Sequence, residues 1–384
     1  MSTTQTTGKF ELPENHEKFT DKYFLRSKEI LEKEGLNPEV AVKVFARGEG
    51  EVAGLEEAEA IVEKYSESDE TELHVTEADE FETKDPLMVL KGPAQDVIDL
   101  ETMYLGAVSH GLTAAHPEHE TVDPEEFGEA VGEVTDIYDV PLLEFGARHY
   151  HWSDTADLAR AAYDNGAVAT STDVGAATFG EEGVGTTPHA LTIMLGEEYG
   201  EDNATRKTAE LFDEHMDEDI PRTTLVDTWN QEIDDALETA EYFENRDVEY
   251  GFRVDTCGEN IAQGGREFDP EAEPYETGTG VRIESVKALK DALVENGYDD
   301  AEIVLSSGFG NPKKAEAFHQ ANLEYEEENG EKLFDAVGAG AFSDGIYATA
   351  DIYEVDGEEF SKVGREADAE AMDEYVEDQM RQVI

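Results

Sequence analysis

Two arginines stand at the ends of apolar runs, in a chain with 28 basic residues against 94 acidic ones. Arg148 follows the run "VPLLEF", and Arg253 lies in "GFRVDT". A guanidinium group binds phosphate or carboxylate through two parallel hydrogen bonds. An arginine at such a position can equally well pair with a structural acid, as Arg253 could with Asp255. The two arginines therefore indicate an anion-binding site without excluding a structural role for either one.

Two glycine-rich turns, "SSGFG" (306–310) and "GAGAF" (338–342), follow the last two apolar runs. Such turns expose backbone N–H groups, and the helix N-terminus that comes next adds positive potential, so the position suits a phosphate. Glycine is also common in tight turns between strand and helix, so each motif alone is weak. Together they predict a phosphate site at one end of a sheet.

Two acids and two histidines also follow apolar runs. Asp227 and Asp255 could hold Mg²⁺ or a ribose diol, and their alternative role is to cap the next helix. His149 and His151 could begin the metal site of a barrel metallohydrolase, but the later histidines leave too few ligands for it. The pattern G-x-x-x-x-G-K-[ST] does not occur, so any ATP used here is not held by a P-loop.

Short apolar runs that alternate with helical stretches must position these groups. From about residue 140, such runs end in polar or glycine-rich turns, which is typical of strand–helix repetition and a parallel sheet. About seven units favour a closed but irregular α/β barrel, in which chemistry gathers at the carboxyl ends of the strands. The expected strands are "VPLLEFGARH", "GAVATST", "ALTIML", "TTLVDTW", "EYGFRVDT", "AEIVLSSGFG" and "LFDAVGAGAF".

The two ends of the chain have a different pattern. Residues 1–120 predict an N-terminal α/β domain, with helices and strands of mixed lengths. Residues 121–342 form the expected barrel domain. Residues 343–384 are expected to return to the N-terminal domain, beginning with a hairpin around Asp356 and Gly357.

The formal net charge of −66 indicates the environment of the protein more than its chemistry. It excludes a broad nucleic-acid footprint, which needs a basic face, and disfavours anionic membrane surfaces. Because molar salt screens charge within roughly 3 Å, acid spread along the whole chain indicates a halophilic protein; an acidic interaction protein is the alternative. With no apolar run of membrane-spanning length, no secretory signal at the start and Cys257 as the one cysteine, we expect a cytoplasmic protein without disulfides or structural zinc.

Nine short motifs, in this order and spacing, connect the sequence to a known family. The chain resembles nicotinate phosphoribosyltransferases, close to their archaeal branch, and more distantly nicotinamide phosphoribosyltransferases. The motifs are "TDKYF" (20–24), "ETMYLGAVSH" (101–110), "EFGARHYH" (144–151), "TSTD" (170–173), "GTTPHAL" (185–191), "LVDTWNQE" (225–232), "GFRVDT" (251–256), "SSGFG" (306–310) and "VGAGAF" (337–342).

The resemblance implies a type II phosphoribosyltransferase fold, which is an irregular α/β barrel beside an α/β sandwich domain built from both termini. It also implies a head-to-tail homodimer with shared active sites. The implied reaction joins nicotinate to 5-phosphoribosyl 1-pyrophosphate and forms nicotinate mononucleotide and pyrophosphate. It requires Mg²⁺ and is coupled to ATP hydrolysis through a phosphohistidine, in the salvage branch of NAD biosynthesis.

The resemblance assigns a role to several residues. His189, in "TPHAL", matches the histidine that ATP phosphorylates, and Asp227 and Asp255 match acids around the ribose and Mg²⁺. Phe145 is expected to stack on the pyridine ring, and Tyr23 to cover its other face from the partner subunit.

Further residues are assigned to substrate binding. Arg148 matches an arginine on the nicotinate side of the site, and Arg253 matches one near the phosphates. The residues that match the 5′-phosphate cradle are Ser307, Gly308, Gly338 and Gly340.

One position bears on the choice between an acid and an amide substrate. Amide-using relatives carry Asp where Thr172 stands, and acid-using relatives carry a small hydroxyl residue. A hydroxyl group can donate to the nicotinate carboxylate, whereas Asp would repel it, so Thr172 favours nicotinate. Asp173 is adjacent, and a shift of one residue in the match would weaken this inference. His149 stands where many relatives have a second basic residue.

Two other functions remain open. Quinolinate phosphoribosyltransferase shares the fold, needs no ATP and binds a dicarboxylate with a denser basic cluster, which the scarcity of Arg and Lys disfavours. A catalytically inactive paralogue could have a binding or regulatory role. The presence of His189, Asp227, Arg253 and Asp255 argues against that role.

Overall fold

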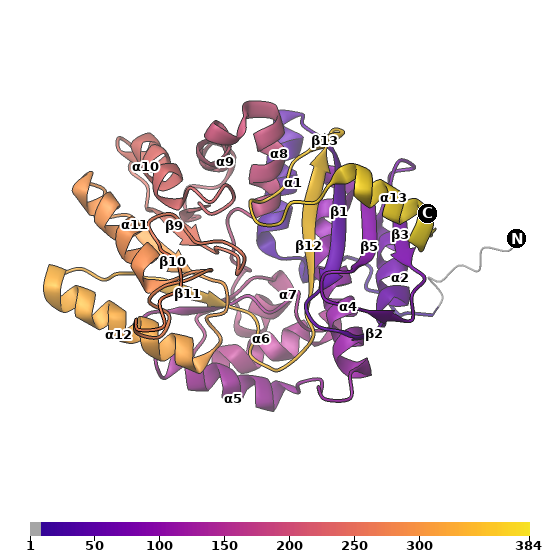
Figure 1. Ribbon diagram of the computed structural model, residues 1–384, viewed down its shortest axis with the longest axis horizontal. Helices are drawn as coiled ribbons and strands as arrows, with labels where there is room; N and C mark the ends of the chain where they lie inside the picture. The colour runs from indigo at the N-terminus through magenta and orange to yellow at the C-terminus, as the bar shows by residue number, and fades with distance from the viewer. Residues whose placement is uncertain (1–8) are drawn as a thin grey trace, which may run out of the picture.

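The computed structural model describes residues 9–384 (Figure 1). Residues 1–8 lie outside the described residues. The structure therefore does not test the expectation that the start of the sequence lacks a secretory signal. Two sheets of six strands each lie side by side, one antiparallel and one parallel. A small third sheet pairs β2 (Gly50–Glu51) with β4 (Glu80–Phe81).

The antiparallel sheet combines both ends of the chain, as expected. Its order is β13-β12-β1-β5-β3-β14. The turn of the predicted hairpin lies at Asp356 and Gly357, whose φ angles of 49° and 82° suit the tight turn that joins two strands. β12 pairs with β1, so the C-terminal part of the chain completes the N-terminal sheet. The strands are β1 (Glu39–Ala46), β3 (Glu72–Thr76), β5 (Pro86–Pro93), β12 (Ala348–Val355), β13 (Glu358–Glu359) and β14 (Met380–Gln382).

Successive residues of a strand point to opposite faces of the sheet, and here apolar residues point to both faces, so helices cover both. Val40, Val42 and Val44 of β1 face the larger core, whereas Ala41 faces a smaller core under α13 (Ala369–Gln379). The helices of the larger core include α1 (Lys22–Glu34), α2 (Leu55–Tyr65), α3 (Ala94–Val97) and α4 (Glu101–Ala115).

The parallel sheet has the order β7-β6-β11-β10-β9-β8, and all its pairs are parallel. Its strands are β6 (Leu142–Glu144), β7 (Ala169–Thr170), β8 (Arg222–Leu225), β9 (Tyr250–Val254), β10 (Glu302–Leu305) and β11 (Ala336–Ala339). Its helices are α5 (Pro124–Thr135), α6 (Thr155–Asp164), α10 (Glu232–Phe243), α11 (Ile283–Glu295) and α12 (Pro312–Asn329). The fold class expected from the sequence is therefore confirmed.

The expectation of a closed barrel is corrected, because the edge strands β7 and β8 do not pair with each other in the described part of the chain. The sheet is an open half-barrel. The run "ALTIML", expected as a strand between these two, forms α8 (His189–Tyr199) instead. An unbroken apolar run suits a buried helix as well as a buried strand.

The chain between β7 and β8 joins the core of the antiparallel sheet. α8 and the next helix, α9 (Glu201–His215), contribute Leu191, Leu195 and Phe212 to that core. The buried helix α8 thus connects the two halves of the molecule, although the sequence placed it inside the barrel domain. The expected domain boundaries remain a prediction.

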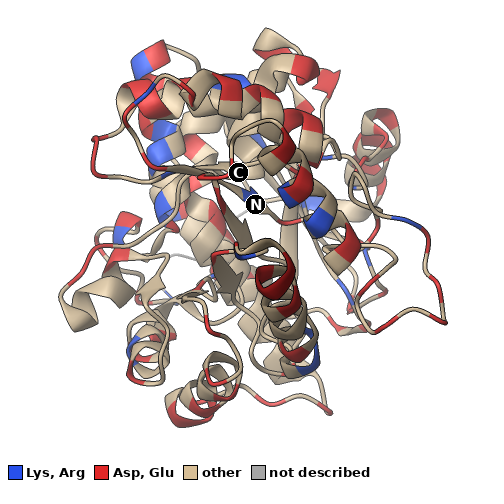
Figure 2. Cartoon of the chain, turned by 90° about the vertical axis from the view of Figure 1, so that its left-hand side faces the viewer, with Lys and Arg blue, Asp and Glu red and all other residues tan. Residues whose placement is uncertain are grey.

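The remaining short elements are α7 (Asp173–Ala176) and the 3₁₀ turns Glu17–Phe19, Ile98–Leu100, Trp152–Asp154 and Ala177–Phe179. Asp and Glu residues lie along many of the helices (Figure 2). No helix within residues 9–384 is long and apolar enough to span a bilayer.

Candidate active site

A cavity of about 360 Å³ lies where the carboxyl ends of the parallel strands face the antiparallel sheet. Side chains of both sheets line it, as do residues of α1 and α8. The predicted site residues among its lining are Tyr23, Phe145, Arg148, His189, Arg253, Asp255, Ser307, Gly308, Gly338 and Gly340. The structure therefore brings most of the predicted site together.

Phe145 is placed by two glycines, Gly338 within β11 and Gly340 just after it. Its backbone N–H donates to the Ala339 carbonyl at 2.7 Å. A Cβ atom on Gly338 would lie 2.3 Å from Cε2 of Phe145, and one on Gly340 would lie 2.4 Å from the Phe145 carbonyl oxygen. The "GAGAF" glycines thus give the aromatic ring room beside the strand, in addition to the phosphate role expected from the sequence.

Arg148 lines the cavity and lies among acidic residues. Its Nη1 donates to Oε1 of Glu101 at 3.0 Å, and its Nε lies 3.4 Å from Oδ2 of Asp21. Burial raises the pKa of Glu101 to about 7, against the opposing effect of Arg148. Although burial opposes it, the nearby carboxylates of Asp21 and Glu101 raise the pKa of Arg148, so the guanidinium keeps its charge.

Arg253 has no carboxylate partner among the described residues. Its guanidinium carbon lies 5.9 Å from the ring centres of both Tyr23 and Phe145, and its buried Nε has no hydrogen-bond partner. The neighbouring Asp255 accepts instead from the Ser306 hydroxyl at 2.9 Å. The structural Arg253–Asp255 pair that the sequence left open is therefore absent, and Arg253 is available to an anion.

His189, at the first turn of α8, belongs to a buried polar cluster. Its Nε2 lies 3.1 Å from Oδ2 of Asp227 and 2.7 Å from Nζ of Lys362, which also forms an ion pair with Asp227. Burial and the Lys362 charge both lower the pKa of His189. Burial alone would raise the pKa of Asp227, but Lys362 and His189 hold it well below its usual range.

Sequence reasoning missed Lys362. The residue follows the β12–β13 hairpin and is buried, with Nζ also 3.1 Å from the Asp255 carbonyl oxygen. The signal that could have found it is an isolated lysine in an acidic segment of a chain with few basic residues. Burying the charge of a lysine is costly unless acceptor groups compensate it, as Asp227 and the Asp255 carbonyl do for Lys362.

The two predicted Mg²⁺ ligands differ in their surroundings. The Asp227 side chain is fully buried and paired with Lys362, whereas Asp255 lines the cavity. No group of three or more His, Cys, Asp or Glu residues that could enclose a metal ion occurs in the described chain. Mg²⁺ commonly binds through one or two carboxylates together with substrate phosphates, so Asp255 fits such an ion better than Asp227 does.

Two predicted substrate-binding residues lie away from the cavity lining. Thr172 is fully buried, and its hydroxyl accepts from the Gly175 N–H at 3.3 Å as the N-cap of α7. Asp173 pairs with Nζ of Lys22 at 2.8 Å. The argument from Thr172 for an acid substrate therefore has no contact in this structure to support it.

The position of Tyr23 corrects another expectation. Tyr23 was expected to reach the ring from a partner subunit, but it lines the cavity of its own chain. An isolated bridge between Asp21 and Thr172, with the Lys22 N–H donating to the Ser171 carbonyl at 2.8 Å, fastens this segment to the edge of the parallel sheet. Burial raises the pKa of Tyr23 well above its usual value, so its ring is uncharged.

His149 lies beside Gly340, which also contacts Phe145. Burial, assisted by Arg148, lowers its pKa to about 3, and its Nδ1 is buried without a hydrogen-bond partner. Its ring packs edge-on against Tyr347 at 4.8 Å. The side chain of His149 is therefore neutral.

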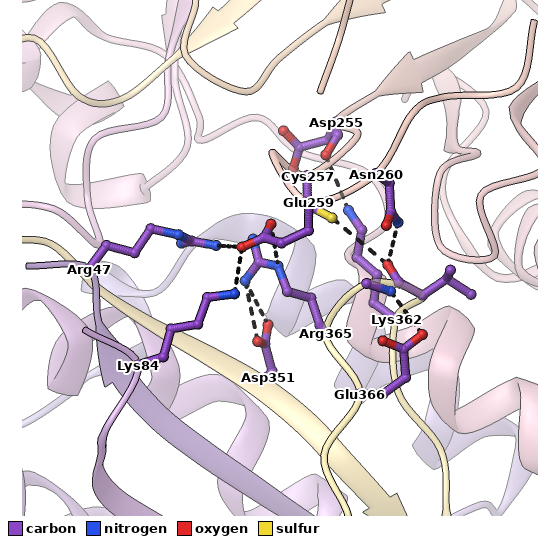
Figure 3. A network of polar contacts seen from close by, with 12 residues as sticks. Arg47, Lys84, Asp255, Cys257, Glu259, Asn260, Asp351, Lys362, Arg365 and Glu366 are labelled. Carbon is purple, nitrogen blue, oxygen red and sulfur yellow. Dashed lines mark hydrogen bonds and ion pairs between the residues drawn. The ribbon is translucent and has the colours of Figure 1, made fainter. Parts of the chain in front are cut away.

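A further ionic cluster, called here the rim cluster, contributes Arg47, Asp351 and Arg365 to the lining of the cavity, and its contacts are drawn in Figure 3. Glu259 holds Arg47 at 2.8 Å, Lys84 at 2.9 Å and Arg365 at 3.5 Å. Arg365 also pairs with Asp351 at 3.2 Å. Although burial opposes it, hydrogen bonds from Arg47 and Lys84 lower the pKa of Glu259 to about 2. The rim thus collects scarce cations next to the cavity.

Comparison with known proteins identifies the fold. A family model described as "Quinolinate phosphoribosyl transferase, N-terminal domain" matches residues 21–111. The solved nicotinate phosphoribosyltransferase of Vibrio cholerae is 13% identical, with a TM-score of 0.65 and coverage of 94% of this chain and 96% of that one. The enzyme of the same name from Porphyromonas gingivalis is 14% identical, with a TM-score of 0.62 and coverage of 90% and 92%. A nicotinate-nucleotide pyrophosphorylase from Pyrococcus furiosus is 25% identical over 93% of this chain and 81% of that one, with a TM-score of 0.44.

The Vibrio and Porphyromonas structures show that this chain has the fold of nicotinate phosphoribosyltransferases. The resemblance seen in nine motifs of the sequence is thereby confirmed at the level of the fold.

Proposed function

We propose that this protein is an ATP-coupled nicotinate phosphoribosyltransferase of cytoplasmic NAD salvage, which makes nicotinate mononucleotide and pyrophosphate. The observation that carries the proposal is the setting of Arg253. In a chain with 94 acidic and 28 basic residues, this guanidinium has no carboxylate partner within residues 9–384 and lies 5.9 Å from the centres of two aromatic rings. An anionic substrate with an aromatic ring supplies what Arg253 lacks.

The nicotinate ring is proposed to lie against Phe145, with Tyr23 on the other side. Both rings line the cavity, and aromatic stacking favours a flat heterocycle there. Arg148 provides a permanent positive charge toward the nicotinate carboxylate, and Arg253 faces the phosphates of the sugar substrate. Stacking then holds the pyridine nitrogen about 3 Å from C1′ of the sugar, as in-line attack requires.

Bond exchange occurs at C1′. The bond from C1′ to the pyrophosphate oxygen breaks while the bond to the pyridine nitrogen forms, through a cationic, oxocarbenium-like state. The Asp255 carboxylate stabilises positive charge on the sugar, and Arg253 stabilises negative charge on the leaving pyrophosphate. When bound, Mg²⁺ would be held by Asp255 and by the substrate phosphates, and it would supply further charge for the leaving group.

ATP coupling is assigned to His189. Because its pKa is lowered, the imidazole is neutral and keeps a lone pair that can attack the terminal phosphorus of ATP. A nitrogen–phosphorus bond forms as the bond to the ADP oxygen breaks. The negative charge that is added beside Lys362 then changes the affinity of the site for pyrophosphate.

A head-to-tail homodimer remains part of the proposal. Since Tyr23 already lines the cavity of its own chain, a partner would have to contribute other groups. Gel filtration in molar KCl, followed by activity measured across protein concentrations, tests whether assembly is needed for turnover.

One assay tests the proposed reaction. The protein is incubated in multimolar KCl with Mg²⁺ and 5-phosphoribosyl 1-pyrophosphate, together with nicotinate, nicotinamide or quinolinate, with and without ATP. Nicotinate mononucleotide formed from nicotinate and stimulated by ATP is the expected result. Product formed from quinolinate alone would contradict the proposal.

Quinolinate phosphoribosyltransferase is the second candidate, because the matching family model is that of its N-terminal domain. The match covers residues 21–111, and it includes Tyr23 but none of the predicted residues at the ends of the parallel strands. The quinolinate arm of the assay separates the two activities. No product from any of the three acceptors would instead favour an inactive paralogue.

A further inference from the structure

Lys314 is a buried lysine for which the reaction described above has no use. It lies in the first turn of α12 with 7% of its surface exposed, and it forms no ion pair with a carboxylate among the described residues. Its Nζ donates to the carbonyl oxygen of Ser307 at 2.7 Å and lies 4.1 Å from the ring centre of Phe309. A buried ammonium group without a counter-ion is costly unless an anion approaches it.

The contact with Ser307 fixes an unfavourable turn. Ser307 has φ 76° and Gly308 has φ 79°, so two successive residues are in the left-handed region. A residue other than glycine rarely adopts this conformation without support from its surroundings. The Lys314–Ser307 hydrogen bond provides such support, directly behind the part of the cavity that Ser307 and Gly308 line.

Further positive charge lies nearby. Burial and the neighbouring Arg282 lower the pKa of Lys314 to about 7, against the opposing effect of Asp255. Arg282 itself has no ion pair among the described residues, and its Nε is buried without a hydrogen-bond partner. Lys314 and Arg282 therefore repel each other, and neither forms an ion pair with a carboxylate among the described residues, although acids are in excess along the chain.

We propose that Lys314 is a positioning residue that holds the Ser307–Gly308 turn and supplies the buried positive charge for the phosphate monoester of a sugar 5-phosphate. The ligand class follows from the geometry, because Ser307, Gly308 and Gly310 line the cavity and a glycine-rich turn of this kind exposes backbone N–H groups to an anion. The N–H groups of Lys313 and Lys314 in the first turn of α12 are instead capped by the Asn311 side chain. Lys314 acts from behind the turn and does not itself line the cavity. The inference rests on the proposed function, which places the sugar phosphate in this cavity.

Ribose 5-phosphate and ribose are the probes, and their binding to the full chain in molar KCl is followed by saturation-transfer NMR. The variant is Lys314→Met, and its matched control is Lys313→Met, which removes an exposed lysine from the same helix turn. We expect Lys314→Met to weaken ribose 5-phosphate binding about tenfold or more, while Lys313→Met stays within about twofold. Ribose binding is expected to change in neither variant.

Steady-state kinetics provide a second readout. Lys314→Met is expected to raise the KM for 5-phosphoribosyl 1-pyrophosphate about tenfold and to leave the KM for nicotinate unchanged, which general structural damage would not do. Lys314→Gln keeps a donor for the Ser307 carbonyl but removes the charge, and we expect it to show an intermediate loss. If Lys314→Met does not fold, Lys314→Gln decides by the same two measurements.

The results separate this inference from the proposed function. Wild-type binding of ribose 5-phosphate by a folded Lys314→Met variant would overturn the inference, even if the protein makes nicotinate mononucleotide. If the protein makes no mononucleotide but binds ribose 5-phosphate in a Lys314-dependent way, the proposed function fails and the inference stands. No wild-type preference for ribose 5-phosphate over ribose would overturn the inference as well.

Discussion

Nζ of Lys362 lies 2.7 Å from Nε2 of His189, although 173 positions separate the two residues in the chain. Lys362 arrives after a hairpin that belongs to the antiparallel sheet, and His189 begins a helix that packs into the core of the same sheet. The pair thus joins the C-terminal segment to the cavity at the ends of the parallel strands. Any phosphoryl group on His189 would meet this ammonium group.

The first prediction concerns coupling to ATP. His189→Ala should abolish the stimulation by ATP and keep some transferase activity, and Lys362→Met should show the same loss of stimulation. The double variant should lose no more than either single one, since the two act as a unit. Product formation with and without ATP measures this, with Lys18→Met, an exposed lysine on the surface, as the control. Continued stimulation of His189→Ala by ATP would show that the role of His189 is wrong.

The second prediction concerns the aromatic slot. Gly338→Ala places a Cβ atom 2.3 Å from Cε2 of Phe145, which is too close, so the ring must move. Overpacking of this kind costs about 1–3 kcal/mol, and we expect a KM for nicotinate at least several-fold higher. Gly132→Ala in α5 is the control, because its nearest contact of 3.4 Å is an ordinary one. If Gly338→Ala and Gly132→Ala have equal KM values for nicotinate, Phe145 does not bind the nicotinate ring.

The third prediction concerns pH and the stability of the fold. The pKa of Lys314 is lowered to about 7 in the folded chain, from 10.5. Between these values the unfolded chain binds more protons than the folded one, so this lysine makes the free energy of unfolding rise with pH. The slope approaches about 1.4 kcal/mol per pH unit for one proton. Denaturant unfolding at pH 7.5 to 9 measures how the free energy of unfolding changes with pH. This slope should be present in Lys313→Met and smaller in Lys314→Met. Equal slopes in the two variants would contradict the prediction.

The fourth prediction concerns salt. A chain with a net charge of −66 repels itself at low ionic strength, and molar salt screens this repulsion. Dialysis from molar KCl to low salt should therefore remove the helical ellipticity, and return to KCl should restore it where aggregation does not intervene. A fold that stays intact at low salt would remove the basis for a halophilic origin.

Several parts of the structure could be predicted from the sequence because local patterns determine them. The Asp356-Gly357 pair predicted the turn that joins β12 to β13, and β12 pairs with β1. Arginines and glycines after apolar runs predicted a site at the ends of strands, and Arg253 and Ser307 lie there.

Other parts depend on contacts between distant segments. The run "ALTIML" is apolar throughout, and only its packing beside the antiparallel sheet determines that it is a helix. Lys362 and Lys314 reach the site from elements whose placement the sequence could not give. The bridge between Asp21 and Thr172 likewise joins residues that lie far apart in the chain.

A crystal structure with bound nicotinate mononucleotide tests the central claim most directly. We expect the pyridine ring against Phe145, its carboxylate toward Arg148 and its phosphate on the Ser307–Gly308 turn in front of Lys314. A mononucleotide bound outside this cavity, or with its phosphate on the rim cluster around Glu259, would contradict the account.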